Sequence, residues 1–280
     1  EAAAIAFSRA LELGVNTADV YSQLGMALSD SGRKDDALTA LLQAGQIDSD
    51  DPATNYYLGN LLREQGEFDV AVLHYRKALA RRPDFPEVYN NLGLILQEQG
   101  DVSGAEAAFA QALVLAPKLG AAHNNMGNWQ IKQGHMEAAL LCFRKAVEMT
   151  PDSPEAWNNL GETYYRLQRL DEAEEAYRKA LAINPGCAEA GLNLGILLLL
   201  RGDFVAGWPY YEQRWAMPAV RDKRPRFAQP EWRGEALDGK ALLIYVEQGM
   251  GDNLQFVRYL GVLRARYPGA KIYYWCLPLL

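Results

Sequence analysis

Apolar and polar positions follow the spacing of an α-helix through most of the chain, and the pattern returns in pairs. Between 86 and 98 the apolar or small positions fall on one stripe at about 3.6 residues per turn. A second stretch, from 102 onward, returns alanine, aromatic and alanine at matching spacing. The first stripe is Tyr89, Leu92, Gly93 and Leu96, and the second is Ala105, Phe109 and Ala112. We expect two antiparallel helices, with glycine letting the second approach closely.

This helix pair is one copy of a repeated unit, and residues 154–185 hold its most regular copy. The glycine at the eighth position recurs every 34 residues, at Gly25, Gly59, Gly93, Gly127, Gly161 and Gly195. A fixed period carrying aromatic, Leu-Gly, Ala, aromatic, Ala and Pro landmarks is typical of tetratricopeptide repeats. The predicted fold is therefore an all-α, right-handed superhelix of helix-turn-helix repeats.

The repeat template divides the first 221 residues. We expect the second helix of a half unit at 1–17, and complete repeats at 18–51, 52–85, 86–119, 120–153, 154–187 and 188–221. The last repeat departs from the template, with Gly207 and Arg214 at the alanine positions. Terminal repeats of a stack are usually atypical. Because the chain begins within a unit, we expect its original N-terminus to lie further upstream.

Breakers separate the helices at regular places. Glycine occupies the turn inside each unit, at Gly32, Gly66, Gly100, Gly134 and Gly202, and Gln168 is the exception. Proline follows the second helices at Pro83, Pro117, Pro151 and Pro185. Proline ends a helix because it lacks the N–H donor and clashes with the preceding turn.

After residue 221 the pattern changes. A linker at 222–240 is rich in proline and in basic residues, which indicates either a solvated connector or an anion-binding loop. A buried strand is predicted at 241–246, a helix at 253–266 and a second strand at 271–277. This order is typical of the first βαβ unit of a parallel α/β, Rossmann-like domain. About 40 residues cannot close such a domain, so we expect 241–280 to be incomplete and the chain to be cut at both ends.

Polar residues recur at the sixth position of the first helices, nearly opposite the packing stripe. The residues there are Gln23, Tyr57, Asn91, Asn125, Asn159 and Asn193. Further asparagines lie at the ninth position, Asn60 and Asn128, and at the fifth, Asn90, Asn124 and Asn158. An amide can both donate to and accept from a peptide backbone. Either these side chains are ordinary solvated residues or they form a peptide-binding ladder, which we expect on the concave face.

Composition narrows the function. The net charge of -7 argues against a general nucleic-acid or anionic-membrane binder. Neither the cysteines, Cys142, Cys187 and Cys276, nor the histidines, His74, His123 and His135, have the spacing of a metal site. We therefore predict no metal in this chain. No apolar run reaches the roughly 20 residues that span a bilayer, and no leader pattern opens the chain, so we expect a cytoplasmic location.

Two phosphate-binding patterns fail on detail. The run from Gly234 to Lys240 reads GEALDGK, but alanine follows where magnesium needs Ser or Thr, and the predicted strand comes after it. Gly249 and Gly251 do follow a strand, yet Leu254 replaces the third glycine of a dinucleotide loop. We therefore keep only the more general interpretation, in which the loop of Gly249 and Gly251 lets an anion or a sugar approach a helix N-terminus.

The repeats resemble the superhelix of the O-linked N-acetylglucosamine transferase family. The resemblance is strongest in the stretch from Asp84 to Asp101, DFPEVYNNLGLILQEQGD. In that family an asparagine ladder holds extended polypeptides, which implies the same role for the asparagines at the sixth position. Gln23 and Tyr57 depart from this ladder.

Residues 202–280 are similar to bacterial tetratricopeptide proteins that continue into a glycosyltransferase domain. The similar stretches are GWPYYEQRW, RFAQPEWRGEALDGKALL and EQGMGDNLQFVRYL, which begin at Gly207, Arg226 and Glu247. Gly251 and Asp252 also resemble the first loop of heptosyltransferases, whose fold (GT-B) has two Rossmann-like domains. The resemblance implies that Asp252 is the base for the acceptor hydroxyl. Asp252 is equally suited to cap the helix that follows.

The leading hypothesis is therefore the polypeptide-binding part of a glycosyltransferase that is inactive as this fragment. A nucleotide-sugar donor is expected for the full-length enzyme and no cofactor for this chain. The alternative is a non-enzymatic scaffold for protein–protein interaction. The expected partner is an extended polypeptide, with self-association through a terminal repeat as a further possibility.

Overall fold

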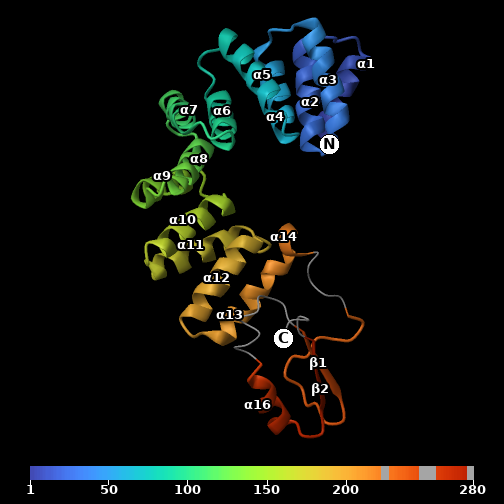
Figure 1. Cartoon of the computed structure of the whole chain (residues 1–280). Helices are drawn as coiled ribbons and strands as arrows, with labels where there is room; N and C mark the ends of the chain where they lie inside the picture. Colours follow the sequence, from blue (N-terminus) through green and yellow to red (C-terminus); the bar gives the residue numbers. More distant parts are fainter. Residues whose placement is uncertain (222–226, 246–256, 276–280) are drawn as a thin grey trace. The chain divides into compact units, whose positions relative to one another are not determined.

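The fold is given by a computed structural model that describes residues 1–221, 227–245 and 257–275 (Figure 1). The chain divides into two compact units, Glu1–Asp222 and Lys223–Leu280. The first unit is helical, and the second contains two strands and a helix. In the described residues no helix is both long enough and apolar enough to cross a membrane.

Helices of the first unit come in pairs joined by tight turns. α1 spans Ala2–Glu12 and packs on α2 through Ala4 and Phe7. The pairs that follow are α2 (Ala18–Asp30) with α3 (Lys34–Ile47), α4 (Pro52–Glu64) with α5 (Phe68–Arg81), α6 (Pro86–Glu98) with α7 (Val102–Leu115), α8 (Gly120–Lys132) with α9 (Met136–Met149), α10 (Pro154–Arg166) with α11 (Leu170–Ile183), and α12 (Ala188–Leu200) with α13 (Phe204–Tyr211). Each of the six first helices is 13 residues long. The predicted helix-turn-helix repeats are confirmed.

Local chemistry sets where the first helices begin. Thr17, Asp51 and Ser153 precede α2, α4 and α10, and each side chain accepts a hydrogen bond from the backbone N–H three residues later. Such caps satisfy N–H groups that have no partner inside the helix. Proline opens α4, α6 and α10, where its missing N–H costs nothing.

The turns inside the units share one backbone geometry. Five turn glycines have φ between +78° and +83°, and Gln168 has φ +60°. After each of these residues, the next N–H donates at 2.9 Å to the carbonyl five residues earlier, as in Arg33 to Leu28 and Arg169 to Tyr164. This is the bond of a Schellman motif. Gln168 therefore replaces a glycine where a side chain strains the backbone.

Close packing of each helix pair depends on the glycine at the eighth position. A Cβ atom on Gly93 would lie 2.7 Å from the Phe109 ring, and one on Gly59 would lie 2.4 Å from the Tyr75 ring. The same relation holds for Gly127 with Phe143 and Gly161 with Tyr177, both at 2.7 Å. The predicted close approach is confirmed: in these four pairs a side chain would collide with the aromatic ring that fills the core, and in the first pair a Cβ on Gly25 would lie 2.5 Å from Leu41.

The last pair is irregular, as its sequence predicts. α13 contains Pro209 and stops at Tyr211, and the chain continues as a 3-10 helix, Glu212–Ala216, and as α14, Pro218–Arg221. A Cβ on Gly195 would lie 2.4 Å from the backbone nitrogen of Tyr211. Buried Arg214 donates to the Glu212 carboxylate at 2.6 Å. In this last pair, Gly195 therefore faces the backbone of α13, whereas the equivalent glycines of the four preceding pairs face an aromatic ring.

The second unit contains a two-stranded parallel sheet. β1 (Ala241–Tyr245) pairs with β2 (Lys271–Trp275), and Ala241 faces Lys271. α16 (Tyr259–Arg266) lies between them in the chain, as a parallel pair requires a crossover. The predicted strand, helix and strand are confirmed. The described helix follows a turn at 257 and 258, and the predicted helix start at 253 lies outside the described residues. A small parallel sheet alone does not establish a Rossmann-like domain.

Candidate functional site

The asparagines predicted as a ladder all lie on first helices. Asn60 is on α4, Asn91 on α6, Asn125 and Asn128 on α8, Asn159 on α10 and Asn193 on α12. All six are partly exposed. We call this surface the ladder face. The fifth-position asparagines, Asn90, Asn124 and Asn158, are buried instead.

Hydrogen bonds join the fifth position of one repeat to the sixth position of the next. Asn125 Nδ2 donates to Asn90 Oδ1 at 3.0 Å. Asn159 donates in the same way to Asn124 at 3.1 Å, and Asn193 to Asn158 at 3.0 Å. The buried carbonyl of one repeat is thereby satisfied by an amide of the next, which avoids the cost of a buried polar group without a partner. The ladder therefore also connects consecutive first helices.

These bonds leave part of each amide unused. Nδ2 of Asn125, Asn159 and Asn193 has a second N–H, and in the described residues nothing donates to their Oδ1 atoms. Asn128 makes no side-chain hydrogen bond within the part of the chain that is described. An amide with one donor and one acceptor to spare can pair with a peptide unit. Three sixth-position amides repeat this arrangement.

The ladder changes at α4 and α6. Asn91 Nδ2 donates to Asn60 Oδ1 at 2.7 Å, and the Tyr75 hydroxyl on α5 donates to the same oxygen at 2.7 Å. Burial raises the pKa of Tyr75 to about 12, although nearby Arg63 acts in the opposite direction. The sequence pattern indicated Asn60 but not Tyr75 or Arg63. The available signal was a tyrosine hydroxyl at a position that holds phenylalanine in the next two repeats, Phe109 and Phe143.

Two buried polar atoms of the first helices have no hydrogen-bond partner in the described structure. They are Nε of Arg63 on α4 and Oε1 of Gln97 on α6. Both residues occupy the twelfth position of their repeat. Unsatisfied buried atoms are few in native proteins, and each calls for an explanation. Their occurrence at one position in successive repeats marks this end of the ladder face as distinct.

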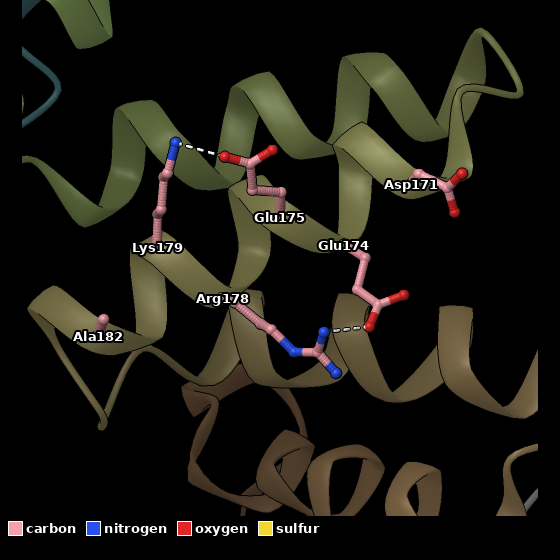
Figure 2. A pocket seen from close by; sticks show the side chains of 6 residues that line it. All are labelled: Asp171, Glu174, Glu175, Arg178, Lys179 and Ala182. Carbon is pink, nitrogen blue, oxygen red and sulfur yellow. Dashed lines mark ion pairs between the residues drawn. The ribbon is translucent and has the colours of Figure 1, made fainter.

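A pocket away from the ladder face is lined mainly by charged side chains that pair with each other. It lies along α11 and is lined by Asp171, Glu174, Glu175, Arg178, Lys179 and Ala182 (Figure 2). Arg178 pairs with Glu174, and Lys179 Nζ lies 2.7 Å from Glu175. Arg201, the residue that follows α12, pairs with Asp171 and Glu174. Its charges pair within the protein, so this pocket offers no free group to a ligand.

The other predicted site residues, Gly249, Gly251 and Asp252, lie outside the described residues. The GEALDGK run is described, and Lys240 Nζ donates to the Ala236 carbonyl at 3.1 Å. Its lysine thus turns back on its own loop. Among the described residues no group of three or more His, Cys, Asp or Glu side chains could hold a metal ion.

Comparison with known proteins identifies the repeats. Models described as tetratricopeptide or TPR repeats match residues 17–45, 59–100, 86–119 and 125–186. Protein FlbA of Caulobacter vibrioides is 44% identical over 66 residues, which are 23% of this chain and 11% of that protein. None of these four models covers the stretch from 226 to 280. The comparisons give no support to the resemblance to glycosyltransferases.

Solved structures agree with the fold. PilF of Pseudomonas aeruginosa has a TM-score of 0.64 at 22% identity, covering 72% of this chain and 92% of that one. PilW, described as a type IV pilus biogenesis factor, has a TM-score of 0.64 at 21% identity, covering 74% and 97%. A thermophilic TPR protein of Thermus thermophilus, TTC0263, has a TM-score of 0.57 at 26% identity, covering 65% and 100%. The repeated helix pairs of this chain are therefore tetratricopeptide repeats.

Proposed function

We propose that this protein is an interaction scaffold whose ladder face binds an extended polypeptide. One observation carries the proposal: Asn125, Asn159 and Asn193 stand in register, and each has a free N–H and a free carbonyl oxygen in the described structure. A peptide in extended conformation has spare donors and acceptors along its length, so successive amides can pair with it without reading its side chains.

The inter-repeat bonds support this role. Because Asn90, Asn124 and Asn158 hold the next amide in place, the ladder is ordered before a ligand arrives. Fixing these side chains in advance reduces the entropy that binding must overcome. The same bonds complicate a simple test, since an alanine at the sixth position weakens repeat stacking as well as ligand contacts.

Asn128 offers a cleaner test. Its side chain lies on the ladder face, three residues after Asn125, and makes no hydrogen bond within the described protein. Asn128→Ala should leave the melting temperature near that of the wild type and weaken a selected peptide about threefold to tenfold, the loss of one or two hydrogen bonds. Gln43→Ala, at an exposed position of α3, is the control. Equal affinity in all three proteins would contradict the proposal.

The second candidate is a glycosyltransferase in which the repeats present the acceptor. The parallel pairing of β1 with β2 around α16 favours it, because a βαβ unit opens such domains. In a protein that extends beyond Leu280, Asp252→Asn should abolish sugar transfer from a nucleotide-sugar and leave the melting temperature unchanged. Unchanged transfer would mean that Asp252 only caps a helix. If the wild type transfers no sugar, the interaction scaffold remains as the proposed function.

A further inference from the structure

Arg63 differs from the other cations of the first helices. The first helices, α2, α4, α6, α8, α10 and α12, are fully described. Together they carry three Lys or Arg residues: Arg63, Lys132 and Arg166. Lys132 Nζ lies 3.5 Å from Glu98, and Arg166 Nη2 lies 2.6 Å from Glu162. No carboxylate lies within ion-pair distance of Arg63 in the described structure. Its charge therefore has no carboxylate partner among the described residues, and its neighbour is the Tyr75 hydroxyl.

Arg166, at the thirteenth position of its repeat, shows how this protein pairs an arginine of a first helix with a carboxylate one turn before it. Its Nε and Nη2 donate to Glu162 Oε1 at 3.0 and 2.6 Å. In the repeat of Arg63 the position of Glu162 is held by Asn60, whose Oδ1 already accepts from Tyr75 and Asn91. Arg63 Nε is buried without an acceptor in the described residues. The repeat thus has the arginine and lacks the carboxylate.

The groups around Arg63 are neutral hydrogen-bonding side chains. Asn60 is one helical turn before it, and the Tyr75 hydroxyl lies close by. Glu64 is its sequence neighbour, but adjacent helical residues point apart, and Glu64 pairs with Lys34 at 2.9 Å. Gln97, at the same position of the next repeat on α6, has a buried side-chain oxygen without a donor in the described part of the chain. Arg63 supplies one positive charge, and the buried Gln97 oxygen of the next repeat lacks an N–H donor in the described residues.

We propose that Arg63 binds an aspartate or glutamate side chain of the polypeptide on the ladder face. The carboxylate takes Nε and a terminal nitrogen, as Glu162 does on Arg166, and a backbone N–H of the same segment donates to Gln97 Oε1. A turn of the guanidinium opens Nε, since Arg63 is only partly buried. Charge-assisted pairs of this kind are stronger than neutral ones. This inference rests on the proposed polypeptide binding and adds an acidic specificity at one end.

A selection experiment tests the charge preference. A random dodecapeptide phage library is panned against the full chain and against Arg63→Gln, Arg63→Lys and Arg178→Gln. Glutamine fits this position, since Gln97 holds it in the next repeat. Arg178→Gln removes the same charge from the exposed surface of α11 (Figure 2). Acidic residues should be enriched on the wild type, Arg178→Gln and Arg63→Lys, and lost on Arg63→Gln.

Direct binding then measures the size of the effect. The best selected peptide and its Asp→Asn version are titrated by fluorescence anisotropy, with melting temperatures as the fold control. The wild type should prefer the acidic peptide about tenfold, and Arg63→Gln should show no preference. Enriched peptides without acidic preference overturn this inference alone; a library without any enriched peptide overturns the proposed function as well.

Discussion

Asn125 donates its side-chain N–H to the buried carbonyl oxygen of Asn90 at 3.0 Å, which connects α8 to α6 across two repeats. The same bond recurs from Asn159 to Asn124 and from Asn193 to Asn158. The asparagines therefore have two roles: one amide hydrogen fixes the stack, and the remaining groups face outward. The proposed polypeptide binding would therefore use the same side chains as repeat stacking.

Asn90→Ala should lower the free energy of unfolding by about 1 to 2 kcal/mol, because it removes a buried acceptor and leaves Asn125 without its partner. Asn125→Ala leaves the buried oxygen of Asn90 unsatisfied and should cost a similar amount. Urea unfolding of both variants and of the double variant gives their coupling, expected at about 0.5 to 1.5 kcal/mol. Additive losses would mean that the two amides act independently.

Gly93→Leu should destabilise the protein by about 1 to 3 kcal/mol through overpacking against Phe109. Gly45→Ala is the matched control, because its new Cβ would meet only the Thr54 methyl group, at 4.0 Å. That variant should gain up to about 1 kcal/mol from the better helix propensity of alanine. Thermal unfolding measures both. A Gly93→Leu midpoint equal to that of the wild type would count against the close packing of α6 and α7.

Gln168→Gly should raise the free energy of unfolding by about 0.5 to 1 kcal/mol. Gln168 has φ +60°, where glycine escapes the strain that a side chain incurs, and this gain exceeds the extra flexibility of glycine in the unfolded chain. The reverse exchange, Gly134→Gln, should destabilise, since Gly134 has φ +82°. If both variants unfold at the same denaturant concentration as the wild type, the turn geometry is not strained.

Alkaline pH should weaken the fold in part through Tyr75. Its pKa is raised by burial from 10.0 to about 12. Stability from this group is complete below pH 10, where the hydroxyl is protonated in both states, and falls as pH rises toward 12, because the unfolded tyrosine ionises first. The loss is about 2 to 3 kcal/mol. Tyr75→Phe should therefore show a shallower fall between these pH values, measured by urea unfolding; an unchanged slope would assign the loss to other groups.

Much of the fold was predictable because the helix ends, the turns and the contact within each helix pair depend on local chemistry. The glycine at position 93 and the phenylalanine at 109 predict a close helix pair, and the exception at 168 is visible as a missing glycine. The pairing of Asn90 with Asn125 was not predictable, because it depends on how one repeat is rotated against the next. Arg63 was missed for the same reason: a cation becomes distinctive only once the neighbouring carboxylates are located.

The central claim, that the ladder face binds polypeptide, is tested most directly by NMR of the asparagine side-chain amides during titration with a selected peptide. The amides of Asn125, Asn128 and Asn159 should shift with a common dissociation constant. The amide of Asn184, which lies beyond α11 and bonds within its own turn, should stay in place. A saturating titration that leaves the three ladder amides unchanged would contradict the account.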